Sequence, residues 1–306
     1  SFFALKSPNP TSRSFNQIQL KGKWFEKKSF QSEKIKDEFN FINNLPKDLK
    51  KFFPRISSKG LIEDKNEFSY FIEYLSGEDC ANKAISNKFD KKISMHFHDF
   101  IYTWLKNVEK YEFNNGIFSS FLIEKCKKRL FSLNEQGLKN KLDSVCSFLN
   151  LPNTDDSLLK ITKIIEKNKI DLNSKPMGLY HGDLCLSNII FHKDNFYLID
   201  PRGFRGGKPN INILYEFAKL RHSIISKYDI LNMDLGTFQI DKNKSFSLID
   251  KQNDSFEFLK YTYYDLLDNF GLDDNIIKIV EASLFFSMMP LHTENYKKIL
   301  SFYLKF

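Results

Sequence analysis

Hydrophobic and polar residues alternate along the first 75 residues with the period of β-strands, in which successive side chains point to opposite faces. Residues 32–44 interrupt this alternation with a helical repeat. Ile35, Phe39 and Ile42 lie there at i, i+4 and i+7 and form one apolar stripe. We therefore expect a small sheet with one helix. The strands are expected at residues 14–20, 23–28, 55–57 and 68–75.

Beyond about residue 80, apolar residues recur at three- and four-residue spacing, which is typical of amphipathic helices. Strands followed by helices predict an α+β chain with two lobes. We place the first lobe at residues 1–75 and the second at residues 76–306. Helices of the second lobe are expected at residues 94–111, 116–132, 139–149, 157–168, 211–227, 255–268, 274–289 and 294–304.

A polar hairpin is set into the helical region. In it, His181-Gly182-Asp183 is followed by Asn188, and a second apolar run ends at Asp200. Phosphoryl transfer from a nucleotide needs a carboxylate that accepts the proton of the attacking hydroxyl, and oxygen ligands for magnesium. Any one of these residues alone would be an ordinary solvated turn residue. Together they predict phosphoryl transfer.

The order His-x-Asp, Asn five residues after the Asp, and then a strand-terminal Asp resembles the catalytic and metal-binding loops of protein kinases. With glycine at position 182 it resembles the small-molecule branch, the aminoglycoside phosphotransferase and choline kinase-like family. The resemblance implies a two-lobed protein-kinase-like fold, with a small antiparallel-sheet N-lobe and a mainly helical C-lobe. It also implies ATP and Mg²⁺ as cofactors, Asp183 as the catalytic base, and Asn188 and Asp200 as metal ligands.

The family places a phosphate-binding lysine and a partner glutamate in the first lobe. In the strand at residues 24–29, Lys27 matches this lysine, and Lys28 competes with it one residue out of phase. Only one of them can face the phosphates, because neighbouring side chains point to opposite sides of a sheet. Glu38 lies seven residues before Leu45-Pro46, as the family's glutamate does, and this favours a Lys27–Glu38 pair.

Two more segments resemble nucleotide-binding parts of the family. The loop before the first strand has no glycine, but Ser12-Arg13-Ser14 resembles a short serine-containing phosphate loop. Ser12 and Ser14 are therefore candidate nucleotide contacts. The strand that ends at Leu75 resembles the hinge between lobes, where backbone groups near Glu73 and Leu75 would pair with adenine. The preference for adenine over guanine is implied by the family alone.

Two arginines, Arg202 and Arg205, follow the metal-binding aspartate. Family members that act on choline or aminoglycosides usually have an acid in this place. Arginine instead favours a neutral or anionic acceptor, because its planar guanidinium suits carboxylate or phosphate. Alternatively, Arg202 satisfies loop carbonyls or pairs with Glu216, which resembles the acid that anchors the catalytic loop and which we expect to be structural.

The composition is that of a globular protein, with 42% hydrophobic and 27% charged residues. The net charge of +8 would permit nucleic-acid binding, but only six of the 46 basic residues are arginines and the lysines are scattered, so no nucleic-acid partner is expected. No apolar run reaches the ~20 residues of a membrane span, and a cytoplasmic protein is expected. The four cysteines lack zinc-site spacing and are expected to be free thiols.

The sequence therefore predicts an ATP-dependent phosphotransferase that moves the γ-phosphate to a hydroxyl of a small molecule, such as a sugar, a sugar phosphate or a related neutral or anionic metabolite. Two alternatives stay open. A choline- or aminoglycoside-type kinase would be favoured by an acidic acceptor cleft. A nucleotide-binding pseudokinase is allowed by the glycine-free loop, although the intact Asp183, Asn188 and Asp200 argue against it.

Overall fold

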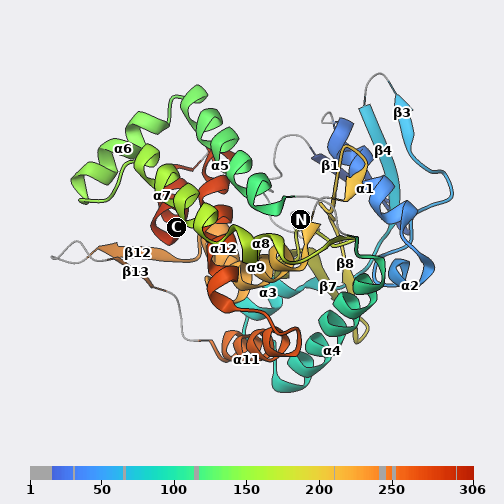
Figure 1. The fold of residues 1–306 in the computed structure, drawn as a ribbon. Coiled ribbons are helices and arrows are strands. Elements are labelled where there is room, and N and C mark those ends of the chain that lie inside the picture. Colours follow the sequence, from blue (N-terminus) through green and yellow to red (C-terminus); the bar gives the residue numbers. More distant parts are fainter. Residues whose placement is uncertain are drawn as a thin grey trace.

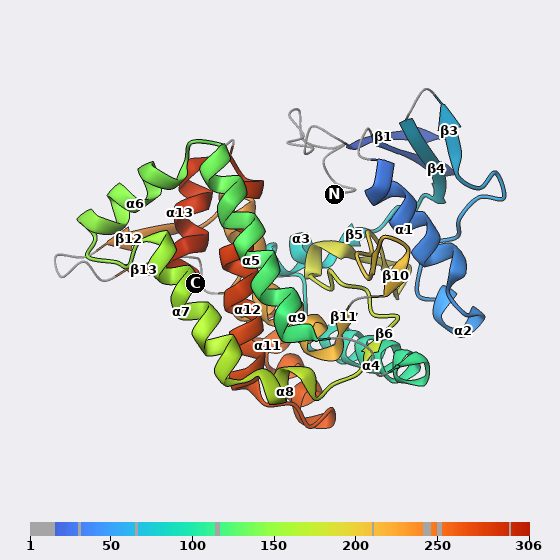
Figure 2. The same ribbon diagram turned by 45° about the horizontal axis from the view of Figure 1, so that its top comes forward.

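The computed structural model describes a first lobe made of a small sheet and one long helix, and a second lobe made mainly of helices (Figures 1 and 2). Strands come first along the chain and helices follow, which confirms the predicted α+β arrangement. The described residues are 16–29, 32–64, 67–113, 117–209, 211–240, 246–249, 253–293 and 295–306.

The sheet of the first lobe is antiparallel, with strand order β1-β2-β4-β3. The helix α1 covers β4, where the Phe39 and Tyr70 rings meet edge to face with centroids 5.7 Å apart. The α1 bounds agree with the predicted helix. The elements of this lobe are β1 (Asn16–Lys21), β2 (Trp24–Ser29), α1 (Ser32–Asn44), α2 (Lys47–Lys50), β3 (Ile62–Asp64) and β4 (Glu67–Glu73).

The strand predicted at residues 55–57 is wrong. Ile56 forms only an isolated bridge with Ile72. The Ser57 N–H donates to the Phe71 carbonyl at 2.9 Å, so the segment borders the last residues of β4 without forming a regular ladder. The strand that pairs with β4 on this edge is β3, which begins at Ile62.

Each helix predicted for the second lobe from its apolar spacing is present, within a few residues of the expected bounds. Asp or Asn side chains cap the first turns of α4, α7, α9, α11, α12 and α13, where they accept hydrogen bonds from backbone N–H groups. The helix α9 packs against both α11 and α12. The helices are α3 (Cys80–Ile85), α4 (Lys91–Val108), α5 (Phe118–Glu135), α6 (Lys139–Phe148), α7 (Thr154–Lys167), α8 (Lys169–Asn173), α9 (Ile213–Ile224), α10 (Tyr228–Asn232), α11 (Asp254–Asn269), α12 (Asp274–Met288) and α13 (Tyr296–Lys305).

The polar hairpin consists of β7 and β8, with Lys193 and Asp194 in left-handed conformation at its turn. The short strand β5, which follows the first lobe directly, pairs with β7. Three other short antiparallel pairs were not predicted. The strands outside the first lobe are β5 (Glu78–Asp79), β6 (Met177–Gly178), β7 (Ile189–His192), β8 (Asn195–Leu198), β9 (Phe204–Arg205), β10 (Lys208–Pro209), β11 (Ile211–Asn212), β12 (Thr237–Ile240) and β13 (Phe246–Ile249).

The largest apolar core runs through both lobes. Phe52 and Phe53, which follow α2, pack against the buried Trp104 of α4, with ring centroids 5.4 and 5.6 Å away. Aromatic pairs of this geometry add to the stabilisation from apolar burial. The segment after α2 is thereby attached to the helical lobe, and the Leu198 N–H donates to the Phe52 carbonyl at 2.7 Å, which ties this segment to the polar hairpin.

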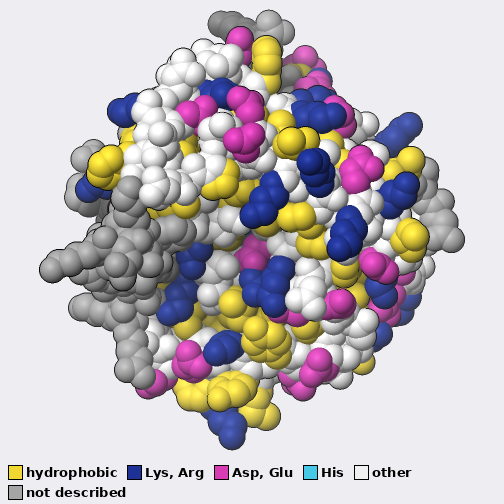
Figure 3. Space-filling view, turned by 60° about the vertical axis from the view of Figure 1, so that its left-hand side comes forward, with side chains coloured by type: hydrophobic (Ala, Val, Ile, Leu, Met, Phe, Trp, Pro, Cys, Tyr) yellow, Lys and Arg dark blue, Asp and Glu magenta, His cyan; other side chains and the backbone are white. Residues whose placement is uncertain are grey.

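The surface shows no single basic face in the view of Figure 3. Lysine and arginine side chains there are interspersed with acidic and apolar ones. No helix in the described part of the chain is long and apolar enough to cross a membrane. The four cysteines are buried free thiols, as predicted.

Candidate active site

The His-Gly-Asp loop is held by a buried glutamate of α9. The backbone N–H groups of His181 and Gly182 donate to the two carboxylate oxygens of Glu216, at 3.2 and 2.6 Å. His181 is buried, and its Nε2 lies 2.9 Å from the Ile199 carbonyl oxygen. Burial lowers the pKa of His181 to about 4, so its ring is neutral near pH 7. Both side chains therefore shape the loop.

Gly182 is required by its conformation and by the space around it. Its φ is +77°, and a Cβ there would lie 2.6 Å from the carbonyl carbon of Arg202. The Arg202 N–H donates to the His181 carbonyl at 2.6 Å, which ties the two loops together at this point. A Cβ on Gly203 would lie only 1.8 Å from the Tyr180 carbonyl oxygen. The two glycines allow direct backbone packing between the loops.

The substitution Gly182→Ala is expected to lower the free energy of unfolding by about 1–3 kcal/mol more than Gly137→Ala does. Both glycines have left-handed φ values, +77° and +68°, but a Cβ on Gly137 would meet nothing within 4 Å. The pair separates the cost of the clash from the cost of the left-handed backbone, which is about 1–2 kcal/mol. Urea unfolding followed by circular dichroism measures both variants. Equal losses would contradict the tight packing at Gly182.

The carboxylate of Asp183 is paired with a lysine that the sequence reasoning missed. Lys219 Nζ lies 2.8 Å from Asp183 Oδ1, and the Lys219 side chain is only 12% exposed. Burial alone would raise the pKa of Asp183, but the Lys219 ammonium holds it well below its usual range. Lys219 follows Glu216 by three residues and lies on the same side of α9. That spacing is the sequence signal that could have identified it.

Asn188 directly precedes β7 and Asp200 follows β8, so both lie at the open end of the β7–β8 hairpin. The Asn188 Nδ2 donates to the Asp183 carbonyl at 2.9 Å, which leaves the amide oxygen for another partner. The described residues include no group of three or more His, Cys, Asp or Glu side chains that could hold a metal ion. One carboxylate and one amide oxygen nevertheless fit Mg²⁺, which commonly takes its other ligands from water and nucleotide phosphates.

Lys27 connects the first lobe with the polar hairpin. Its ammonium forms ion pairs with Glu38 of α1 and with Asp200, and the hydroxyl of Tyr70 donates to the same Glu38 carboxylate. Lys27 and Glu38 are both buried. Burial alone would lower the pKa of Lys27, but the Asp200 and Glu38 carboxylates outweigh it and raise the pKa. The Lys27–Glu38 pair expected from the sequence is present.

Lys28, the alternative to Lys27, points to the opposite side of the sheet. Its ammonium pairs with Glu67 at the start of β4, and its side chain is 37% exposed. The alternation along β2 therefore gives the buried position to Lys27 and the solvent-facing position to Lys28.

Arg202 lies within this charged cluster. Its Nη1 donates to Glu38 Oε2 at 3.3 Å, whereas Glu216, the partner considered from the sequence, accepts from the backbone of the His-Gly-Asp loop. Burial alone would lower the pKa of Arg202, but the surrounding carboxylates, led by Glu38, raise it. Arg202 is therefore next to the candidate site, with its guanidinium directed to α1.

Arg205 is exposed on β9, outside the charged cluster. The turn between β9 and β10 is tied to α1, because the N–H groups of Gly206 and Gly207 donate to the Asp37 carboxylate at 3.0 and 2.8 Å. Arg205 thus lies on a hairpin of the second lobe that is attached to the helix of the first.

The connection between the lobes begins at the end of β4. The Glu73 carboxylate accepts two hydrogen bonds from the Arg55 guanidinium, at 2.9 and 2.7 Å, so its side chain is already engaged. Leu75 is buried in a small apolar cluster with Ile190 and Ile199, separate from the two main cores. This cluster lies between the connection and the polar hairpin. The backbone of the connection and this apolar cluster are therefore next to each other.

The serines predicted to contact phosphates, Ser12 and Ser14, lie outside the described residues. The segment that contains them leads into β1. That strand pairs with β2, which carries Lys27.

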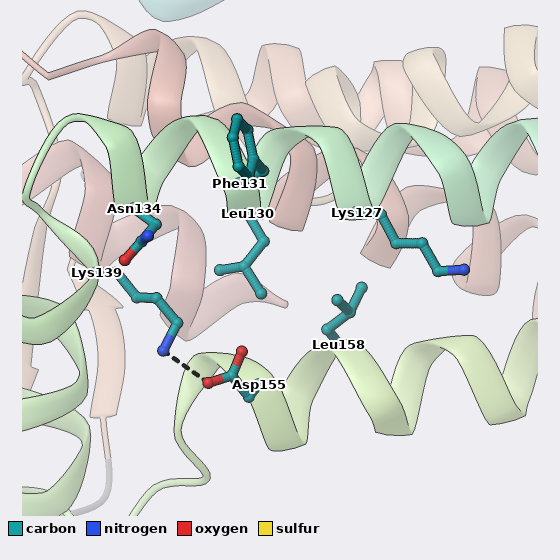
Figure 4. A pocket seen from close by; sticks show the side chains of 7 residues that line it. All are labelled: Lys127, Leu130, Phe131, Asn134, Lys139, Asp155 and Leu158. Carbon is teal, nitrogen blue, oxygen red and sulfur yellow. Dashed lines mark ion pairs between the residues drawn. The ribbon is translucent and has the colours of Figure 1, made fainter.

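Two pockets of the second lobe contain none of these candidates. One, of about 290 Å³, lies between α5, α6 and α7, and the Lys139–Asp155 ion pair crosses it (Figure 4). The other, of about 420 Å³, is lined by residues of α5, α7 and α8. The candidate active site is therefore identified from the contacts among its polar side chains, and neither of these two pockets belongs to it.

Comparison with known proteins gives a likeness in structure only. No family model matches the chain, and no curated protein matches its sequence. A solved glucosamine kinase, in complex with glucosamine, ADP and inorganic phosphate, aligns with 95% of this chain and 74% of its own, with a TM-score of 0.51 and 9% identity. Crystal form A of a glucosamine kinase aligns with 95% of this chain and 72% of its own, with a TM-score of 0.50 and 8% identity.

The chain has a two-lobed protein-kinase-like fold. This confirms the fold class expected from the His-Gly-Asp hairpin. A spectinomycin phosphotransferase in complex with ADP and spectinomycin is also similar, over 95% of this chain and 84% of its own, with a TM-score of 0.47 and 11% identity. In the kinase-like chain, the polar hairpin and the Lys27–Glu38 pair come from different lobes and meet at Asp200.

Proposed function

We propose that this protein is an ATP-dependent phosphotransferase that moves the γ-phosphate of ATP to a hydroxyl group of a small molecule. The observation that carries the proposal is the meeting of Lys27, Glu38 and Asp200, since a buried lysine held by two carboxylates beside a polar hairpin is suited to nucleotide phosphates. Residues 1–75 would form the nucleotide lobe and residues 76–306 the catalytic and acceptor lobe.

The nucleotide would lie between the lobes. Backbone groups near Glu73 and Leu75 would pair with the adenine edge, and the cluster of Leu75, Ile190 and Ile199 would contact the adenine face. Lys27, oriented by Glu38, would meet the phosphates as a compact positive charge. Ser12 and Ser14, which lie outside the described residues, stay proposed phosphate contacts from the resemblance alone. The ADP in the complexed glucosamine kinase, which has the same fold, is consistent with this proposal.

Asn188 and Asp200 would hold Mg²⁺ through their side-chain oxygens. The bound ion would supply positive charge that neutralises the phosphate oxygens. The Asn188 amide is oriented for this role by its hydrogen bond to the Asp183 carbonyl, 2.9 Å long.

Asp183 would orient the acceptor hydroxyl and accept its proton. Its side chain is 29% exposed, which leaves a way for a substrate to reach it. Glu216 and His181 would keep the loop in shape without touching the reacting atoms. The preference for a neutral or anionic acceptor, such as a sugar or a sugar phosphate, rests on the sequence prediction that Arg202 and Arg205 contact it, and in the structure Arg202 donates to Glu38.

An ATP-consumption screen across sugars, sugar phosphates, amino alcohols and aminoglycosides tests the proposal. We expect acceptor-dependent consumption with a sugar or sugar phosphate, and none with the Asp183→Asn variant. A best acceptor among the amino alcohols or aminoglycosides would replace the proposed acceptor class with the cationic one. Calorimetric binding of MgATP without consumption on any acceptor would favour the pseudokinase.

A further inference from the structure

A row of polar side chains leads from Asp183 along α9 to α5. Lys219 pairs with Asp183, and Tyr215 precedes Lys219 by four residues, so both lie on one face of α9. Lys125 of α5 donates from Nζ to the Tyr215 hydroxyl at 2.5 Å, and its Nζ lies 4.9 Å from the centre of the Tyr215 ring. The row therefore places two ammonium groups on the side of Asp183 that faces α5.

The row carries more positive than negative charge. Among the described residues, Lys219 forms an ion pair with Asp183, while Lys125 has the Tyr215 hydroxyl as its partner and no carboxylate. Lys125 is partly buried, and the rings of Phe118 and Phe121 pack on Tyr215 beside it. A bound anion would supply the counter-ion that Lys125 lacks among the described residues.

Lys219 pairs with the carboxylate that is proposed to accept the hydroxyl proton. The carboxylate of Asp183 has two oxygens, and Lys219 lies 2.8 Å from one of them. A hydroxyl acceptor must approach this carboxylate to within hydrogen-bond distance. An anionic group on the acceptor would attract the Lys219 ammonium and, at the same time, place the hydroxyl near Asp183.

We propose that Lys219 and Lys125, with Tyr215 between them, form a binding site for an anionic group of the acceptor, a phosphate or a carboxylate. The inference rests on the proposed phosphotransferase function and narrows its acceptor class from neutral or anionic to anionic. The acceptor carries its negative group on the α5 side of the hydroxyl that receives the phosphoryl group. Lys219 acts as a positioning residue that the substrate draws from Asp183.

Lys125 distinguishes the binding of an anionic group on the acceptor from contact with the transferred phosphoryl group. Lys219 alone could contact the transferred phosphoryl group. Tyr215, however, precedes Lys219 by about one helical turn, a rise of about 6 Å along α9, and Lys125 reaches Tyr215 from α5, so Lys125 has no direct contact with Asp183 among the described residues. A contribution of Lys125 to anion binding is therefore expected only if the acceptor itself carries the anion.

Phosphate binding tests the site without any turnover. Inorganic phosphate is titrated calorimetrically into the full chain saturated with Mg²⁺ and the β,γ-imido analogue of ATP, which fills the phosphate positions of the nucleotide. We expect Lys219→Met and Lys125→Met each to weaken phosphate binding at least about tenfold. Lys128→Met is the matched control, because Lys128 is exposed on the same helix, and it should bind like the wild type. Equal binding by Lys125→Met and the wild type, or no binding by the wild type, would overturn the inference.

Steady-state kinetics distinguish the failure of this inference from the failure of the proposed function. Each sugar is compared with its phosphorylated form, and we expect ATP consumption with the phosphorylated members. Lys125→Met should raise the acceptor KM at least about tenfold with the KM for ATP unchanged. A preferred neutral or cationic acceptor would overturn the inference and leave the phosphotransferase. Lysine-dependent phosphate binding without any ATP consumption would support the anion site and contradict the phosphotransferase.

Discussion

Asp183→Asn is expected to lower turnover by about 10²–10⁴-fold, the usual effect of removing a general base. The asparagine keeps the shape of the side chain but can no longer accept the hydroxyl proton. Nucleotide binding should be nearly unchanged, because the residues proposed to meet the phosphates are Lys27, Glu38 and Asp200, which form a separate set of ion pairs. Steady-state turnover with the acceptor found in the screen, together with calorimetric titration of MgATP, measures the two quantities.

A control is needed because Asp183→Asn also leaves Lys219 without its carboxylate. A buried unpaired lysine destabilises a fold, so urea unfolding of the variant should accompany the kinetics. The double variant Asp183→Asn with Lys219→Met removes both charges and should be as inactive as the single one. Turnover near the wild-type value in a folded Asp183→Asn protein would refute the assigned role.

Asp200→Ala is expected to abolish the magnesium dependence of nucleotide binding and to weaken MgATP binding about 10- to 100-fold. The substitution removes the carboxylate proposed to hold the ion, and it also removes one of the two acidic partners of Lys27. Lys27 keeps its ion pair with Glu38, so its ammonium stays near the proposed phosphate position. Calorimetric titration with ATP, with and without Mg²⁺, measures both effects.

The matched control is Asp194→Asn. Asp194 is an exposed aspartate at the turn of the same hairpin, with φ of +60°, a conformation that asparagine also tolerates. Its substitution should leave MgATP binding as in the wild type. Unchanged affinity in Asp200→Ala would mean that Asp200 is structural, and would remove the basis for assigning Asn188 as the second ligand.

The first lobe was predictable where local periodicity decides the structure. The stripe of Ile35, Phe39 and Ile42 predicted α1 with the bounds that the structure has. The two-residue alternation of β2 allowed only Lys27 or Lys28 to face inward, and the spacing of Glu38 favoured Lys27. The structure contains this pair. Such patterns succeed because repeats of 3.6 and 2 residues follow directly from the geometry of helix and strand.

The strand expected at residues 55–57 failed because strand pairing depends on a partner that is distant along the chain. Ile56 and β3 lie on the same edge of β4, and the tertiary arrangement gives the regular ladder to β3. The two-residue strands of the second lobe have no periodicity that a sequence pattern could reveal. Their pairing is decided by which loops the helices bring together.

The charged residues show the same difference between what the sequence predicts and what only tertiary packing decides. The sequence alone determined the chemical types present at the hairpin, Asp183, Asn188 and Asp200, because they are close along the chain. Only the tertiary structure decided that Arg202 reaches Glu38 and that Lys219 reaches Asp183. Those partners are separated by 164 residues in the first case, and in the second they join a loop to a helix. Ion pairs act through space, so the packing of α1 and α9 around the hairpin selects them.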